Sequence, residues 1–488
     1  MAGSTPYLPY DVLQSIIECS KDHPRTLVAC CLVNEQLHGL ASSALYSSLC
    51  LWVGGRMGPG RKNTKKWTSK PISGNRIEYA LRSASLPHNQ NRYPGTYYED
   101  SFGEKALLRA FKVFKRLESI TFNVTGPRWR TPENSDAFDL RTLVQAITIV
   151  NEEACLRELR LNSIVEAVSD TERTLLSRHS LKKMNLIDHD EDILDKIPRE
   201  ALAGLEELQV RTYNWSQKRG SLLANTFAGI TNNCRNLKSL TLGIVHMSLN
   251  EALFHAVTQL PHLQELCLEY WFHGYPSNPL ETADFPTNFP PPRTLRSFTL
   301  RYKGRSEYKL NVTAVCKWIK HVISLSPIER LNFIPFYQPR TRNPVQKSSW
   351  DILTDHLADK HAGTLRSFDL RAAFVRQVAL KAIFRKCHQL EDFSVATGQG
   401  SLMLLKQYAS NLPKLTRARF ELRTMKGSRK QPQIDPQMAD TILQAAHLRR
   451  LVVNDDEWEG LWILEDGALK HLVRHSSLVS DYDRRRRR

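Results

Sequence analysis

The sequence predicts an α/β fold in which short parallel strands form a curved sheet with helices on its outer face, preceded by a small bundle of helices. Two observations predict the repeats. A Leu-x-x-Leu-x-Leu pattern, with conservative replacements, occurs twelve times between residues 117 and 453, and helix-like segments precede many of the copies. A third observation predicts the bundle, because residues 8–51 contain three short segments with apolar side chains at helical spacing.

The twelve copies are regularly spaced. Five of the steps between neighbouring copies are 24–26 residues, which is within the range of leucine-rich repeats. Isolated strands of an ordinary α/β domain would not keep this register, so we expect one solenoid over residues 104–478. The copies begin at Leu117, Leu156, Leu181, Leu205, Leu237, Leu263, Leu295, Ile328, Leu365, Leu390, Leu415 and Leu448.

Each copy has two distinct faces. The fourth and sixth positions lie on one side of a strand and are apolar almost throughout, whereas the third, fifth and seventh lie on the other side and are polar. Each repeat is therefore expected to be a helix, a turn and a strand, and stacking buries the leucines. The clearest helical segments are Glu104–Arg116, Asn225–Asn233, Glu251–Gln259, Val312–Leu325, Val375–Lys386, Leu402–Ser410 and Gln437–Ala446.

Irregular segments interrupt or flank the repeats. Residues 52–103 read as a basic loop or linker with a possible degenerate repeat, and residues 479–488 as a disordered basic tail. Inserts near residues 273–293, 335–347 and 423–436 are expected to be surface loops, which could also frame a binding site. A final helix near residues 466–475 is expected to cap the array.

The N-terminal segments predict three short helices. Leu13, Ile16 and Ile17 share one helical face, and the same spacing recurs after the break at His23-Pro24 and again from Leu37. So small a bundle buries little surface by itself and benefits from a partner or a neighbouring domain.

These residues resemble an F-box over residues 5–51. The resemblance lies in Leu8-Pro9, Asp11, Val12-Leu13, Ile16-Ile17, Cys31-Leu32-Val33-Asn34, Leu40-Ala41 and Leu45-Tyr46. One departure is Leu37, which stands near the place where many F-boxes carry tryptophan. The resemblance implies binding to a Skp-type adaptor by residues that divide between the bundle core and the adaptor surface, namely Leu8, Pro9, Leu13, Ile16, Ile17, Leu32 and Val33.

An F-box followed by leucine-rich repeats implies the substrate receptor of a Skp–cullin–F-box ubiquitin ligase. Such a receptor reaches the cullin through the adaptor, holds a target protein on its repeats, and performs no chemistry itself. Two alternatives remain open: a scaffold of leucine-rich repeats without ligase function, and a basic protein associated with nucleic acid. The second is suggested by the formal net charge of +18 and by the terminal run Arg484–Arg488.

The polar strand face suggests where a target would bind. Arginine forms paired hydrogen bonds with carboxylate or phosphate, so we expect an acidic or phosphorylated target, with aromatic residues beside the charges. The alternative is that the mixed charges are only solvated and that nearby acids pair with the arginines. The candidate target-binding residues are Arg160, Arg211, Arg301, Arg330, Arg371, Tyr270, Trp271 and Tyr302.

Other classes of protein are not indicated. We find no glycine-rich phosphate loop, catalytic triad motif, metal-ligand spacing or nucleic-acid-binding motif, and therefore expect no enzyme activity and no cofactor, and favour a protein target over a nucleic-acid partner. No stretch approaches 18 uncharged apolar residues and no signal peptide is evident, so we expect no membrane span. Nine scattered cysteines without a CxxC pair suit a reducing compartment, cytoplasmic or nuclear.

Overall fold

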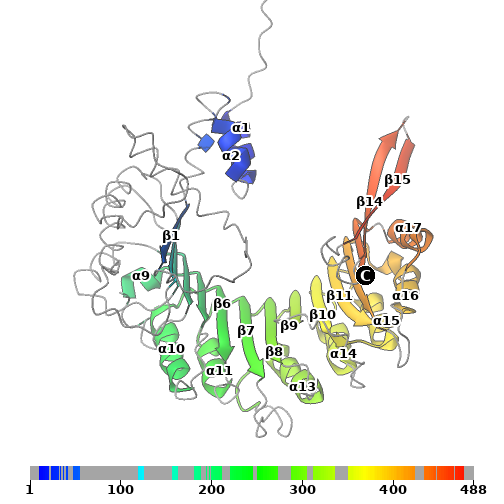
Figure 1. Ribbon diagram of the computed structural model, residues 1–488. Helices are drawn as coiled ribbons and strands as arrows, with labels where there is room; N and C mark the ends of the chain where they lie inside the picture. Colours follow the sequence, from blue (N-terminus) through cyan, green and yellow to red (C-terminus); the bar gives the residue numbers. More distant parts are fainter. Residues whose placement is uncertain are drawn as a thin grey trace, which may run out of the picture. The chain divides into compact units, whose positions relative to one another are not determined.

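A computed structural model describes the chain over most of its repeats (Figure 1). The described residues are 10–20, 24–31, 33, 37, 40–41, 48–54, 119–125, 157–162, 181–187, 194, 197, 199–211, 220–245, 250–272, 287–304, 312–335, 350–423, 434–446, 448–454, 456–465 and 468–477. They fall into two compact units, residues 1–216 with 232–236 and residues 217–231 with 237–488.

The first unit begins with short helices. Helix α1 spans Tyr10–Cys19, α2 spans Pro24–Cys31, and Leu37, Leu40 and Ala41 are helical as well. Ile17, Leu27 and Ala41 form one buried cluster, against which Cys30, Leu37 and Leu40 pack. The three segments of helical spacing therefore share a single small core.

The sheet of the first unit is parallel and follows the order of the chain. Its strands are β1 (Ser48–Gly54), β2 (Ser119–Thr125), β3 (Glu158–Asn162), β4 (Lys183–Ile187) and β5 (Glu207–Arg211), with α9 (Arg199–Ala203) before β5. Strand β1 pairs with β2 along its whole length, from Ser48 opposite Ser119 to Gly54 opposite Thr125. The last four residues of the expected F-box range 5–51 thus belong to the sheet.

The second unit continues the pattern. Its parallel strands are β6 (Ser239–Val245), β7 (Glu265–Phe272), β8 (Ser297–Gly304), β9 (Arg330–Pro335), β10 (Ser367–Phe374), β11 (Asp392–Thr397), β12 (Arg417–Leu422) and β13 (Arg450–Val453). The antiparallel strands β14 (Asp456–Glu465) and β15 (Ala468–Ser477) complete it. The chain is therefore an α/β leucine-rich-repeat solenoid, as the sequence predicts.

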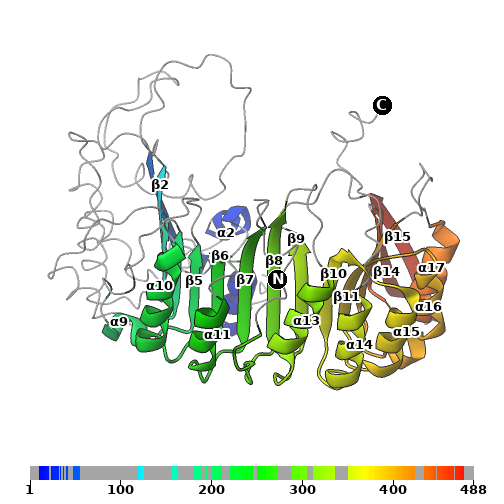
Figure 2. The same ribbon diagram turned by 90° about the horizontal axis from the view of Figure 1, so that it is seen from below.

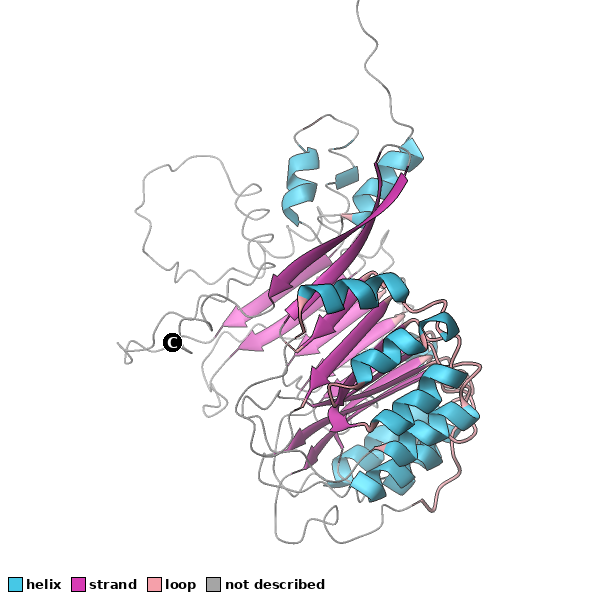
Figure 3. Cartoon of the chain, turned by 90° about the vertical axis from the view of Figure 1, so that its right-hand side faces the viewer, coloured by secondary structure: helices cyan, strands magenta, loops and turns pink. Residues whose placement is uncertain are grey.

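Helices cover one face of these strands (Figures 2 and 3). They are α10 (Gly220–Asn233), α11 (Asn250–Thr258), α13 (Val312–Ile323), α14 (Asp351–Lys360), α15 (Gln377–Lys386), α16 (Ser401–Gln407), the 3-10 turn η3 (Ala409–Asn411) and α17 (Pro436–Ala445). Helix α14 was not among the clear sequence predictions. The predicted helix at residues 104–116 lies outside the described residues.

All twelve sequence copies form strands, and each strand begins at the third position of its copy. Backbone hydrogen bonds between successive second positions fix this register. The N–H of Arg366 donates to the carbonyl of Glu329 at 2.8 Å, and that of Glu391 donates to Arg366 at 2.7 Å. The first position is buried wherever it is described, as Leu365 and Leu390 illustrate at 0% exposure.

Aromatic side chains fill the interior between repeats. Phe368 stacks on Phe393 with ring centroids 5.8 Å apart, and Phe393 meets the edge of Phe420 at 5.2 Å. Burial raises the pKa of the Cys234 and Cys387 thiols to about 12, so these cysteines are packing residues.

The structure corrects one expectation. Residues 468–475 of the expected final helix form a strand instead, because β15 pairs with β14 over ten residues despite the helical spacing of Leu469, Leu472 and Val473. Residues 287–293 form an irregular segment in which Thr287, Asn288, Pro290 and Arg293 are exposed, whereas Phe289 anchors it at 4% exposure and stacks on Phe254 at 4.1 Å. Residues 273–286, 336–347 and 424–433 of the inserts, residues 55–103 and residues 479–488 lie outside the described residues.

Candidate functional site

Helix α1 separates its apolar residues into a buried and an exposed set. Leu13 and Ile17 are 7% and 3% exposed, whereas Val12 and Ile16 are 39% and 44% exposed. Residues four apart lie on the same helical face, so the two pairs form two neighbouring stripes. Leu13 and Ile17 therefore belong to the core, and Val12 and Ile16 remain open to a partner.

Val33 extends the exposed apolar set. It follows α2, donates its N–H to the carbonyl of Cys30 at 3.2 Å, and is 66% exposed. We call Val12, Ile16 and Val33 the exposed aliphatic set. Leu8, Pro9 and Leu32, which the F-box resemblance also implies in adaptor binding, lie outside the described residues.

On the strand face opposite the helices, the candidate arginines are paired with acids. Arg301 contacts Glu269 at 3.0 Å between Nη1 and Oε1, from directly opposed positions of β8 and β7. Arg330 on β9 forms an ion pair with Glu265 on β7, reaching past the small side chain of Ser297 on β8.

Arg371 is held within its own strand. Its Nε and Nη2 donate to the two carboxylate oxygens of Asp369, with the shortest contact at 2.6 Å. The Arg423 guanidinium donates to the Arg371 carbonyl at 3.2 Å. Asp392 and Glu421 also interact electrostatically with Arg371, so this arginine already has several acidic neighbours. Burial raises the pKa of both of these carboxyls.

The three arginine pairs differ in burial. The side chain of Glu269 is 3% exposed, and those of Arg371 and Asp369 are 20% and 15% exposed. The Arg330–Glu265 pair is open, at 53% and 45%. An exposed ion pair contributes about 0–1 kcal/mol, whereas breaking a buried one is much costlier. Among these three arginines, Arg330 can most readily exchange its partner for a target.

The three candidate aromatic residues and the two remaining candidate arginines lie in β3, β5, β7 and β8. Tyr270 is not a surface residue: it is 2% exposed, and its ring meets the edge of Trp318 at 5.8 Å. Strand β7 continues to Phe272, so the eighth position turns into the core. Arg211 is half-buried at the end of β5. The side chains of Arg160, Trp271 and Tyr302, which lie in β3, β7 and β8, are outside the described part of the structure.

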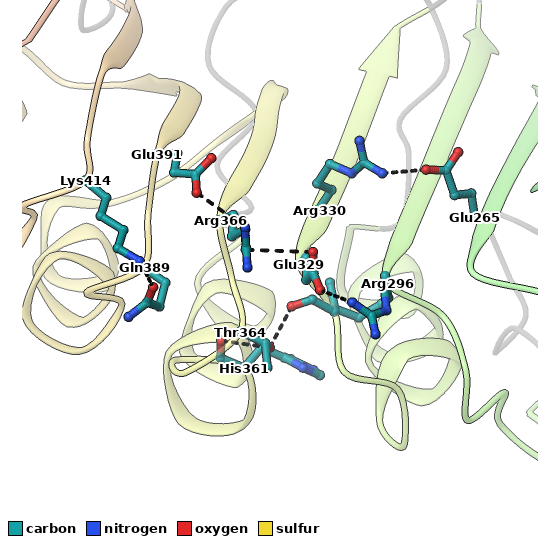
Figure 4. Close-up of polar contacts among 11 residues, drawn as sticks. Glu265, Arg296, Glu329, Arg330, His361, Thr364, Arg366, Gln389, Glu391 and Lys414 are labelled. Atoms are coloured by element: carbon teal, nitrogen blue, oxygen red, sulfur yellow. Dashed lines mark hydrogen bonds and ion pairs between the residues drawn. The ribbon is translucent and has the colours of Figure 1, made fainter.

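A row of alternating charges runs along the beginnings of four successive strands (Figure 4). Arg296 contacts Glu329 at 2.9 Å, and Arg366 contacts Glu329 at 3.8 Å and Glu391 at 3.6 Å. These residues occupy the second position of their copies, directly before each strand begins. Because the row is largely exposed, each contact adds little stability, but together they favour the observed repeat register.

Two other kinds of site are absent from the described part of the chain. It contains no group of three or more His, Cys, Asp or Glu residues able to hold a metal ion. It also contains no helix with the length and apolar character needed to cross a membrane.

Comparisons with known proteins add little to this geometry. No protein-family model and no curated protein matches the chain. One similar solved structure is the leucine-rich repeat-containing protein LegL7 from Legionella pneumophila, with 14% identity, a TM-score of 0.33, and coverage of 73% of this chain and 96% of that one.

Another similar structure is the yeast complex of Rad7 and Elc1. It has 12% identity and a TM-score of 0.37, and it covers 67% of this chain and 76% of that one. At these TM-scores neither likeness carries an argument about function, which has to come from the residues themselves.

Proposed function

We propose that the chain is the substrate-recognition adapter of a Skp–cullin–F-box ubiquitin ligase. The observation that carries the proposal is the division of apolar residues in the N-terminal helices. Leu13 and Ile17 are buried, whereas Val12, Ile16 and Val33 are exposed. Exposed aliphatic side chains on so small a bundle favour a protein partner, and the F-box resemblance implies that this partner is a Skp-type adaptor.

The solenoid would supply the target-binding surface. Where side chains are described, its parallel strands present a largely polar outward face, and repeat proteins use extended surfaces of this kind for binding. In this proposal the chain contributes binding only, and the other ligase subunits transfer ubiquitin to the bound target.

The ion pairs on the strand face indicate which arginine could bind an acidic or phosphorylated target. Arg301 and Arg371 are held by Glu269 and Asp369, so a target carboxylate or phosphate would have to displace a partly buried acid. Arg330 is half-exposed and weakly held by Glu265. We therefore place an acidic or phosphorylated group of the target at Arg330.

The proposed compartment is the cytoplasm or the nucleus. The described cysteines are free, and three of them, Cys234, Cys316 and Cys387, are buried without disulfides. Free thiols in the core are typical of proteins in reducing compartments.

Affinity purification tests the ligase assignment. The full chain is compared with a chain lacking residues 1–47, which keeps β1 and all later strands. The full chain should recover the Skp adaptor and a cullin, and the shortened chain should lose both while retaining target proteins that are no longer degraded. Recovery of target proteins without the adaptor by the full chain would instead support a scaffold outside the ligase.

A further inference from the structure

Among the described strands, the C-terminal hairpin forms one edge of the sheet. Strand β15 pairs with β14 from Ala468 opposite Glu465 to Ser477 opposite Asp456, and β15 has no second neighbour among the described strands. An uncovered edge strand presents unpaired backbone N–H and C=O groups to any extended chain.

The hairpin also extends beyond the rest of its sheet. Strand β13 pairs only with Asp456–Glu459, so the later residues of β14 have β15 as their one described neighbour. Figure 1 shows the far end of this red hairpin projecting past α17. A two-stranded ribbon is only marginally stable by itself, and a third strand would stabilise it.

The two faces of the hairpin differ. On one face Trp458 is 2% exposed, and the Nδ1 of His471 lies 3.0 Å from Asp440 of α17, so this face packs against the solenoid. On the other face Leu461 and Leu472 are opposite each other and are 46% and 49% exposed.

Strand β15 carries basic residues on either side of Leu472. Lys470 and Arg474 alternate with Leu472 along the strand, and residues 468–477 contain no acidic residue, although Glu459 of β14 is opposite Arg474. The chain that follows ends in Arg484–Arg488. Opposite charges in cross-strand positions stabilise strand pairing, and like charges destabilise it.

We propose that β15 binds an extended acidic segment of another protein, which adds to the sheet as a further strand. The segment's backbone would pair with the open edge of β15, and its alternate acidic side chains would lie beside Lys470 and Arg474. A second copy of β15 is a poorer occupant, because pairing two such strands brings their lysines and arginines together.

The test uses the full chain and a labelled eight-residue peptide of alternating valine and glutamate. The proposal predicts saturable binding, together with slower hydrogen exchange of backbone amides in residues 468–477. The same peptide with every amide N-methylated keeps its charge but cannot form the ladder, and it should bind at least tenfold more weakly. Equal binding of both peptides would show charge attraction alone and overturn the proposal.

Two matched variants locate the site. Lys470→Glu with Arg474→Glu should weaken binding of the acidic peptide at least tenfold and favour a valine–lysine peptide. Lys381→Glu with Arg385→Glu makes the same charge change at exposed positions of α15 and should leave binding unchanged. Equal loss in both variants, or a dimer of the free chain that the first variant dissociates, would contradict the proposal.

Discussion

Ile16 and Ile17 are adjacent in α1, yet Ile17 is 3% exposed and packs with Leu27 and Ala41, whereas Ile16 is 44% exposed. One residue of helix rotates a side chain by about 100°, which is enough to move it from the core to the surface. Two chemically identical side chains therefore have different roles: Ile17 stabilises the bundle, and Ile16 is exposed and available to a partner.

The first prediction separates these roles by stability. Ile17→Ala should destabilise the bundle by about 2–4 kcal/mol, because it leaves a cavity in a small core. Ile16→Ala should change stability by less than about 0.5 kcal/mol. Hydrogen exchange of residues 10–31 measures both, and equal loss of protection in the two variants would show that the assigned core is wrong.

The second prediction concerns the arginine pairs. Arg301→Met should destabilise the second unit by about 1–3 kcal/mol, because it removes a cation beside the buried Glu269 carboxylate. Arg330→Met should cost no more than about 1 kcal/mol, because its pair with Glu265 is exposed. Urea unfolding provides the comparison. Adding Glu269→Gln to Arg301→Met should restore part of the loss; a further loss of the same size would contradict the pairing.

The third prediction is a pH dependence. His361 is 3% exposed at the end of α14, its ring centroid lies 5.3 Å from that of His356, and burial lowers the pKa of His361 from 6.5 to about 4. Between these values the unfolded chain binds more protons than the folded one. The stability contribution is therefore complete above pH 6.5 and falls by up to about 3 kcal/mol as the pH drops towards 4.

His361→Gln removes this titration, so the melting temperature of the variant should depend less on pH between 6.5 and 4 than that of the unaltered chain. Burial also lowers the pKa of His356, which acts in the same direction. The raised pKa values of Asp392 and Glu421 act in the opposite direction, so the comparison between variant and unaltered chain is the informative quantity. Identical pH profiles would contradict the assignment.

The fourth prediction concerns Gly460 in β14. A Cβ atom at this position would lie 2.7 Å from the carbonyl oxygen of Leu448 and 2.9 Å from Nε2 of His471. The first neighbour is backbone and cannot move aside easily. Gly460→Ala should therefore displace the hairpin from α17 and lower stability by about 1–3 kcal/mol. A melting temperature within one degree of the original would show that the hairpin tolerates the side chain.

The repeats could be predicted from sequence because their signal is local and repeated. All twelve leucine patterns became strands, since each one specifies its own alternation of core and surface residues. The C-terminal hairpin could not be predicted from such a local pattern. Leu469, Leu472 and Val473 have helical spacing, and only the pairing of their segment with the distant residues of β14 decides in favour of a strand.

The candidate site was less predictable because it depends on contacts between repeats. Outward arginines were identifiable, but the partner of Arg330 lies two strands away, and Glu265 is found only once the register is known. The six-residue pattern does not give the length of β7, so it cannot show that Tyr270 continues the strand and turns into the core. In α1, helical periodicity grouped Ile16 with Ile17 and could not divide core from exposed residues.

The most direct test is the affinity of the purified full chain for a purified Skp adaptor, measured by titration calorimetry. Ile16→Glu places a charge in the exposed aliphatic set and should weaken binding at least tenfold without unfolding the helices. Val378→Glu makes the same kind of change at a residue that is 80% exposed on α15, and it should leave the affinity unchanged. Unaltered binding by folded Ile16→Glu, or no binding by the unaltered chain, would contradict the proposed adapter function.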